Sequence, residues 1–197
     1  MKKKADPEVY QAKKQLLKQL MELEDQEVIQ LYFTDETGFS LTPSIPYGWI
    51  PEGEQWSIRS AKDRVCNLFG LLSRKGNLKV YSTAQNINSN FIIECVDEIA
   101  EQIQIPTVLV MDNAPWHKSE LVQSKQTEWN EKGLYLFYLP TYSPHLNLIE
   151  TLWRKIKYEW LRPQDYISAK NLKNAIYNII TKYNDEFSVN ISKNFFL

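Results

Sequence analysis

The feature that most constrains the fold is a short, continuously apolar run at residues 107–111, set between two stretches with helical periodicity. The preceding stretch, residues 89–104, repeats apolar side chains at helical spacing, and Pro106 ends it. The following stretch, residues 119–131, has a helical pattern closed by Gly133. A strand that is apolar on both sides and flanked by helices is typical of a parallel sheet covered on both faces.

The order of the remaining elements predicts a mixed sheet. A β-branched and aromatic run at residues 28–33 is expected to be a strand that stops at a loop beginning with Thr34. Two further strands joined by a turn at residues 73–77 form an antiparallel meander. We therefore expect an α/β fold, with three antiparallel strands followed by alternating helices and parallel strands, flanked by helices. The other predicted segments are strands at 65–72, 78–84 and 134–139, helices at 5–27, 146–161 and 168–183, and turns or a short hairpin at 40–57.

Length and composition exclude several classes of protein. A chain of 197 residues has room for one domain, or for one domain and an arm. A hydrophobic content of 43% and a net charge of -1 exclude disorder as the main state. No apolar run reaches the roughly 18 residues of a membrane span, and the N-terminus has no signal-peptide pattern. Cys66 and Cys95 are too few for a disulfide framework. Taken together, these features lead us to expect a cytoplasmic protein without a membrane partner.

The charge distribution is a weak guide to partners. The sequence has 23 basic and 24 acidic residues, which by itself argues against nucleic acid. Basic residues gather in the first 19 positions and again between Arg154 and Arg162. Solvated helix faces often show such patches, so charge alone does not establish DNA binding.

Two acidic residues follow apolar runs in the same way. Asp35 comes after the first predicted strand, and Asp112 comes directly after the run at 107–111. Ligands collect at the carboxyl ends of strands in open α/β sheets, and carboxylates placed together there repel each other unless a cation lies between them. A third candidate, Glu150, lies in an apolar band of the predicted helix at 146–161. Either a metal ion or Arg154 could compensate its charge.

These carboxylates suit phosphoryl transfer assisted by two Mg²⁺ or Mn²⁺ ions. No convincing nucleophilic Ser, Cys or Lys is present, and no Gly-rich phosphate loop occurs. Taken singly, each acid has a simpler explanation, as a turn former or as a member of a structural ion pair. His117, five residues after Asp112, is either a surface imidazole or a contact to a substrate phosphate.

The motifs around the acids carry a resemblance to a known family. Residues 33–39 (FTDETGF), 111–117 (MDNAPWH) and 140–153 (PTYSPHLNLIETLW) resemble the DDE transposases, and within them the bacterial insertion-sequence branch related to the mariner elements. The resemblance implies an RNase H-like catalytic domain. It further implies that the metal-binding, catalytic triad consists of Asp35, Asp112 and Glu150, holding two Mg²⁺ (or Mn²⁺) ions. The supporting or DNA-binding residues that we carry over from the motifs are Asn113, His117, Asn147, Arg154 and Lys155.

The resemblance also implies an activity and partners. Such an enzyme cleaves double-stranded DNA at the ends of a mobile element and joins the freed ends to target DNA. We expect a linker helix or arm at residues 1–27, the catalytic domain at 28–187 and a tail at 188–197, without the helix-turn-helix region of intact relatives. The protein would act as a homodimer or with a helix-turn-helix partner. The alternatives are a non-catalytic remnant that binds DNA or a full-length transposase, and an unrelated metal-dependent phosphatase or nuclease.

Overall fold

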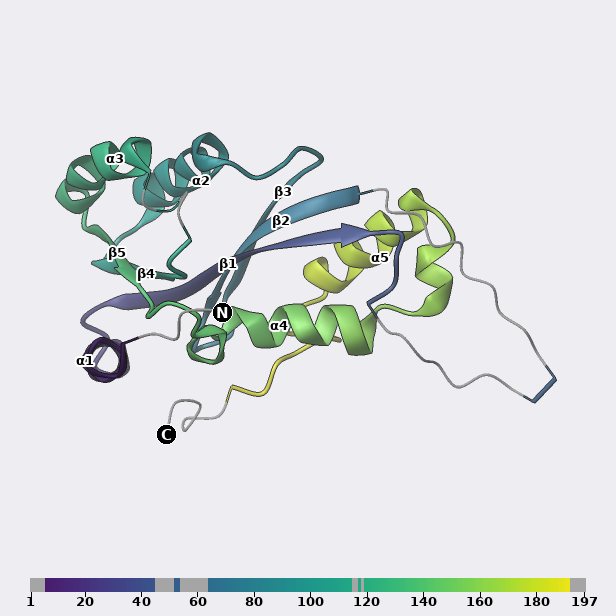
Figure 1. The fold of residues 1–197 in the computed structure, drawn as a ribbon, viewed down its shortest axis with the longest axis horizontal. Helices are drawn as coiled ribbons and strands as arrows, with labels where there is room; N and C mark the ends of the chain where they lie inside the picture. The colour runs from purple at the N-terminus through teal and green to yellow at the C-terminus, as the bar shows by residue number, and fades with distance from the viewer. Residues whose placement is uncertain (1–5, 45–51, 54–63, 115–116, 118, 192–197) are drawn as a thin grey trace.

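A computed structural model describes residues 6–44, 52–53, 64–114, 117 and 119–191 (Figure 1). Its centre is one five-stranded sheet in the order β3-β2-β1-β4-β5. β1, β2 and β3 pair antiparallel, whereas β1, β4 and β5 pair parallel. The predicted mixed sheet is therefore confirmed. The strands are β1 (Gln30–Ser40), β2 (Arg64–Ser73), β3 (Leu78–Thr83), β4 (Thr107–Met111) and β5 (Leu134–Tyr138).

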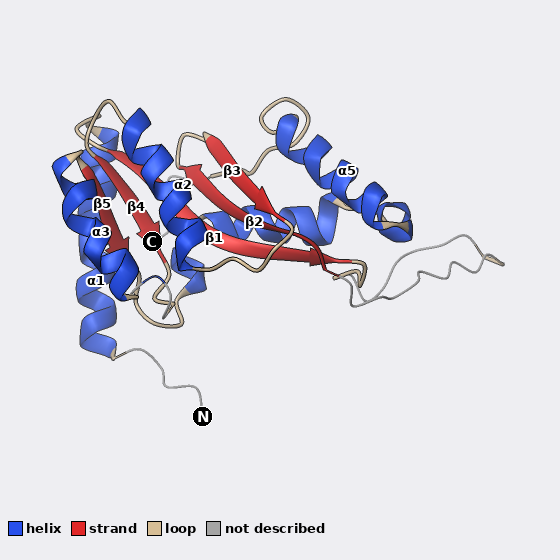
Figure 2. Ribbon diagram, turned by 90° about the horizontal axis from the view of Figure 1, so that it is seen from above, coloured by secondary structure: helices blue, strands red, loops and turns tan. Residues whose placement is uncertain are grey.

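Helices cover both faces of this sheet (Figures 1 and 2). α2 and α3 pack on one face around Phe69, Leu109 and Trp129, while α1, α4 and α5 share a second core with Phe33 and Val110 on the other. Both faces of the central strands are therefore buried, as the continuously apolar β4 requires. The α-helices are α1 (Pro7–Asp25), α2 (Ser89–Gln102), α3 (Glu120–Glu131), α4 (Ile149–Lys155) and α5 (Ala169–Thr181).

β1 is longer than the sequence predicts. The expected end at Thr34 is wrong, because the strand continues to Ser40 and its whole length from Tyr32 pairs with β2. The polar residues after Phe33 have a turn-like composition, but β2 supplies their hydrogen-bond partners across the sheet. Asp35 consequently lies inside a strand rather than in a loop, and it points to the face opposite that of Glu36.

The helix expected at residues 146–161 is divided. A 3₁₀ turn, Pro144–Leu146, precedes α4, and Asn147 between them has an extended backbone. After α4 the helix continues as a π-turn, Ile156–Trp160, and a 3₁₀ turn follows at Pro163–Ile167. The helix therefore restarts at Ile149, which places Glu150 in its first turn.

α1 packs against the sheet layer rather than extending from it. Leu17 and Met21 are buried in the same core as α4 and α5. At the end of the helix, Glu24 forms a salt bridge of 3.1 Å with Arg74 in the turn after β2. Near its start, Tyr10 Oη and His145 Nε2 lie 2.9 Å apart, which ties α1 to the turn before α4.

Some predictions fall on residues that the structure does not describe, and others concern single side chains. The predicted turns at 40–57 lie mostly outside the described residues, as do the last six residues of the predicted tail. Cys66 and Cys95 are buried free thiols. None of the described helices combines the length and the apolar character that a membrane span requires.

Candidate active site

The pairing of β1 with β4 brings Asp35 next to Asp112. The two strands run parallel, and Phe33 lies opposite Val110. Asp35 lies two residues beyond Phe33 within β1, and Asp112 lies two residues beyond Val110, just after the end of β4. Strand alternation directs Asp35 toward the face covered by α4, because Phe33 belongs to the core on that side. Asp112 lines a pocket together with Glu150, and its charge acts on the Asp35 carboxyl.

α4 is held close to this point of the sheet. Ile149 and Leu152 are fully buried beneath the helix, and the Asn147 amide donates a 2.9 Å hydrogen bond to the Thr34 carbonyl oxygen on β1. Gly70 on β2, the register partner of Asp35, lies so close to the helix that an added Cβ would be 2.6 Å from the Trp153 ring. This close approach brings the first turn of α4, with Glu150, over the Asp35 position.

Burial and neighbouring negative charge raise the pKa of two of the three carboxyls, those of Asp35 and Glu150. Burial, followed by the negative charges of Glu150, Glu36 and Asp112, raises the pKa of the Asp35 carboxyl to about 8. Burial also raises the pKa of Glu150, and the charge of Asp112 acts in the same direction. Such mutual repulsion is what a bound cation would relieve.

The donor atoms at this point fit a hard divalent cation. The candidate ligands are carboxylate oxygens, which Mg²⁺ and Mn²⁺ prefer. The Asn147 side-chain oxygen beside them is buried and has no hydrogen-bond partner among the described residues, so it is a further oxygen available to a bound ligand. Within the described ranges, no three His, Cys, Asp or Glu side chains are yet gathered closely enough to surround an ion. The carboxylates are close enough for their charges to affect the pKa of Asp35, but they do not yet surround a single ion.

Asp112, Glu150 and Asn147 line one pocket of about 460 Å³. Asn113 lies on its wall and donates a 3.1 Å hydrogen bond to the Thr141 hydroxyl, which fixes the loop after β4 against the loop after β5. The loop that precedes α4 supplies part of the wall, so Asp112 and Glu150 face one pocket from opposite sequence segments.

Of the cations on the helix, Lys157 is the one that sequence reasoning missed. It follows Glu150 by two helical turns, and its Nζ lies 5.4 Å from the centre of the Phe39 ring. Burial lowers the pKa of Lys157, although the charges of Asp35 and Glu150 oppose that shift. The charge of Lys157 lowers the pKa of Glu150 more than the charge of Arg154 does. The seven-residue spacing from Glu150 was the signal that could have found it.

The predicted supporting cations lie further out. Arg154 is exposed, and it lines a separate pocket of about 380 Å³ with Tyr158 and Glu159. The Lys155 ammonium forms a 2.5 Å ion pair with Glu159 on the helix surface. Both lie on the helix that carries Glu150, and their contact with DNA stays a prediction.

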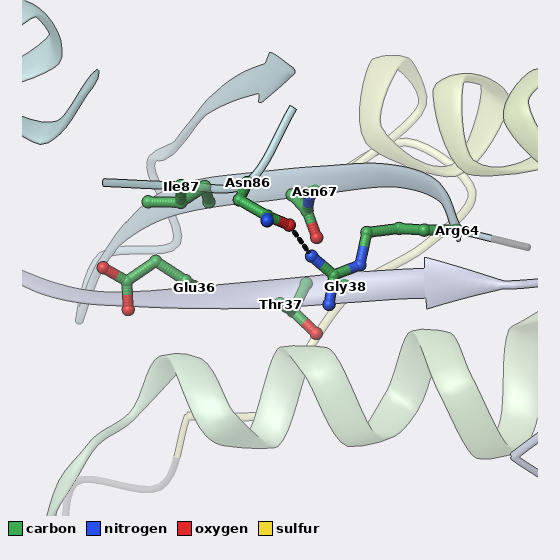
Figure 3. A pocket seen from close by; sticks show the side chains of 7 residues that line it. All are labelled: Glu36, Thr37, Gly38, Arg64, Asn67, Asn86 and Ile87. Atoms are coloured by element: carbon green, nitrogen blue, oxygen red, sulfur yellow. Dashed lines mark hydrogen bonds between the residues drawn. The ribbon is translucent and has the colours of Figure 1, made fainter. Parts of the chain in front are cut away.

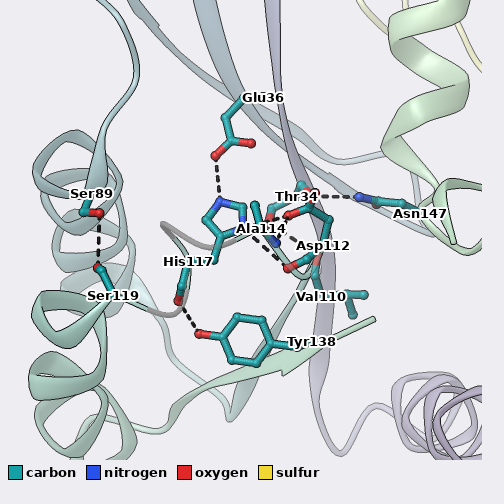
Figure 4. Close-up of polar contacts among 10 residues, drawn as sticks. All are labelled: Thr34, Glu36, Ser89, Val110, Asp112, Ala114, His117, Ser119, Tyr138 and Asn147. Carbon is teal, nitrogen blue, oxygen red and sulfur yellow. Dashed lines mark hydrogen bonds and ion pairs between the residues drawn. The ribbon is translucent and has the colours of Figure 1, made fainter. Parts of the chain in front are cut away.

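His117 is buried, which contradicts its interpretation as a surface imidazole. Its ring is only 1% exposed, with Nε2 2.7 Å from Glu36 Oε1 and Nδ1 2.9 Å from Asp112 Oδ1 (Figure 4). Burial alone would lower the pKa of His117, but Asp112 and Glu36 outweigh it and raise the pKa to about 10. For Asp112 the effects are reversed: burial alone would raise its pKa, but the hydrogen bonds from His117 and the Ala114 N–H outweigh burial and lower it.

A second polar pocket lies on the α2 side of β1 (Figure 3). It has a volume of about 350 Å³ and includes Glu36 and Gly38. Arg64 donates to the Asn86 side-chain oxygen, and Asn67 donates a 2.7 Å hydrogen bond to the Gln85 carbonyl oxygen. Asp112 and Glu150 line the pocket of about 460 Å³ and not this one, whereas Asp35 lines neither. Glu36 on the wall of this second pocket is connected to Asp112 through His117.

Residues 30–173 match the family described as DDE superfamily endonuclease. The chain belongs to this family. The matched region spans every strand of the sheet and contains all three candidate carboxylates. Among curated proteins, no sequence matches it.

Solved structures similar to this chain include those of the Mos1 mariner transposase. The Mos1 paired end complex with Mn matches at a TM-score of 0.62 and 15% identity, covering 93% of this chain and 58% of the Mos1 chain. The catalytic domain of Mos1 transposase matches at a TM-score of 0.56 and 12% identity, covering 92% and 85%. The Mos1 strand transfer complex matches at a TM-score of 0.61 and 15% identity, covering 94% and 57%. The chain thus has the RNase H-like fold, and it spans under three-fifths of the longer Mos1 chains.

Proposed function

We propose that this chain is a transposase catalytic domain that cleaves DNA at the ends of an insertion sequence and transfers the cut strand to target DNA. The observation that carries the proposal is that the charges of Asp112, just after β4, and of Glu150 on α4 both act on the Asp35 carboxyl in β1. Membership of the DDE endonuclease family supports phosphodiester cleavage as the reaction.

Each residue has a stated role in this proposal. Asp35, Asp112 and Glu150 hold divalent ions at the carboxyl end of β4. Two ions bound to their oxygens would activate an attacking oxygen and neutralise charge at the scissile phosphate. Lys157 offsets part of the acidic charge, and Asn147 anchors α4 to β1. No covalent intermediate with the protein is required.

The cofactor and partners belong to the same proposal. We assign Mg²⁺ or Mn²⁺ to the site, because the donors are carboxylate oxygens and the similar Mos1 paired end complexes are described with Mn and with Mg. The substrates are the double-stranded ends of the element and the target DNA. Synapsis of two ends calls for a homodimer, or for pairing with a helix-turn-helix component.

Plasmid nicking tests the proposal. Supercoiled DNA is incubated with the purified chain and Mg²⁺ or Mn²⁺, with and without a chelator, and joining is followed with a labelled duplex. We expect metal-dependent nicking that Asp112→Asn abolishes. Asp185→Asn, the same chemical change at an exposed position after α5, should leave it intact. Nicking that survives in folded Asp112→Asn would contradict the assignment.

A further inference from the structure

The contacts of His117 connect two of the sequence motifs. Glu36 belongs to the motif on β1, while Asp112 and His117 belong to the motif after β4. The imidazole lies between the two carboxylates, and each ring nitrogen contacts one of them (Figure 4). The ladder between β1 and β4 ends at Phe33 and Val110, so His117 links the two strands beyond their last paired residues.

The backbone of His117 is held in place by hydrogen bonds from neighbouring elements. The Tyr138 hydroxyl on β5 donates a 2.7 Å hydrogen bond to the His117 carbonyl oxygen. Gln126 on α3 in turn donates to the Tyr138 hydroxyl at 3.2 Å. β5 and α3 thereby hold the segment that carries the imidazole, so the ring has a defined place from which to act on Asp112.

The contacts on Asp112 select one of its two oxygens. The Ala114 N–H donates to Oδ1 at 3.0 Å, and His117 Nδ1 lies 2.9 Å from the same atom. Both therefore engage Oδ1, which leaves Oδ2 as the atom to present to a cation in the pocket. The Asp112 side chain is 50% exposed, so without these contacts it could adopt other rotamers.

We propose that His117 is a positioning residue that orients the Asp112 carboxylate for metal binding by bridging it to Glu36, and that it does not contact the DNA. This inference rests on the proposed function only in taking Asp112 as a metal ligand. An imidazole that is 1% exposed, with both nitrogens against carboxylates, cannot reach a phosphate without breaking those contacts. Partners that orient metal ligands typically change metal affinity by about 10–100-fold when removed.

Manganese binding to the full chain, measured without DNA by the electron paramagnetic resonance of free Mn²⁺, tests this role. His117→Ala should weaken binding by about 10–100-fold. His117→Asn keeps a donor near the Nδ1 position, so it should bind Mn²⁺ more tightly than His117→Ala. His145→Ala, at the exposed second histidine, is the matched control and should leave the affinity unchanged.

Combination with Asp112→Asn separates positioning from a general structural effect. If His117 acts through Asp112, His117→Ala should cause no further loss of Mn²⁺ affinity in that background. Should His117→Ala fail to fold, Glu36→Gln replaces it, because the amide removes the charged partner but keeps a hydrogen-bonding side chain. Weaker Mn²⁺ binding by folded Glu36→Gln is then the expected result.

The outcomes distinguish this inference from the proposed function. Unchanged Mn²⁺ affinity in folded His117 and Glu36 variants would overturn the positioning role, and so would losses that add fully to that of Asp112→Asn. A wild-type chain that binds Mn²⁺ through His117-oriented Asp112 but cleaves no DNA would overturn the proposed function alone. Absence of Mn²⁺ binding by the wild-type chain would overturn both.

Discussion

Gly70 sets the distance between α4 and the sheet, and replacing it should move the candidate active site. A Cβ at this position would lie 2.6 Å from two atoms of the Trp153 ring and 2.8 Å from Ile149 Cδ1. Carbon atoms pack at roughly 3.5–4.0 Å, so the helix must shift by about 1 Å. Ile149 and Trp153 are fully buried and flank Glu150, which leaves little space for any other adjustment.

We expect Gly70→Ala to destabilise the fold by about 1–3 kcal/mol, the usual range for an overpacked core. That loss corresponds to a fall in melting temperature of roughly 2–12 °C for a domain of this size. Metal-dependent nicking should fall by as much as about 10²-fold, since a displacement of about 1 Å is costly in a catalytic site. Thermal unfolding and plasmid nicking measure the two effects on the same protein.

A double-mutant cycle with Trp153→Phe tests the cause. Phenylalanine lacks the ring atoms Cζ2 and Cη2 that the added Cβ would meet, so Gly70→Ala should cost less in that background. Ser82→Ala, at an exposed position on the neighbouring β3, is the control and should be close to neutral. Full stability of Gly70→Ala, or strict additivity with Trp153→Phe, would refute the close approach of α4.

Three further predictions concern charged groups. Burial raises the pKa of Glu24 above 4.5 despite Arg74, so the contribution of Glu24 to stability is present below that pH and is lost as pH rises through the folded pKa. In urea unfolding from about pH 4.5 to 7, the stability of Glu24→Gln should therefore depend less on pH than that of wild type, and parallel profiles would contradict this. Arg74→Met should lower the free energy of unfolding by about 3–5 kcal/mol at neutral pH, because it leaves the buried Glu24 carboxylate without its partner, and by less in acid. An equal loss of stability at both pH values in urea unfolding would refute the pairing. Lys157→Met should bind Mn²⁺ more tightly than wild type, because it removes a positive charge beside the carboxylates, and weaker binding would show that Lys157 supports the ion in another way.

Local pattern was sufficient to predict much of the fold. The run at β4 was recognisable because a strand buried on both faces is apolar throughout. The position of Asp112 followed from the end of that run, and Glu150 stood out as a carboxylate within an apolar helix stripe. The antiparallel meander of β2 and β3 was visible from its turn, since Gly76 has a positive φ of 86° there.

The missed features depend on contacts between distant segments. The extension of β1 through Asp35 and Glu36 comes from pairing with β2, whereas the local sequence is turn-like. The burial of His117 depends on β4 ending where β1 continues, which no single segment reveals. Lys157 was missed for a different reason. Its spacing from Glu150 can be read from the sequence, but Arg154 and Lys155 are closer to Glu150 in sequence and were predicted as the supporting cations instead.

The most direct test of the account is the location of manganese in crystals of this protein, from its anomalous scattering. We predict Mn²⁺ peaks beside oxygens of Asp35, Asp112 and Glu150, at ligand distances of roughly 2.0–2.5 Å. The same crystals of Asp112→Asn should lose or weaken those peaks. Manganese bound only elsewhere, with these carboxylates unoccupied at saturating concentration, would contradict the central claim.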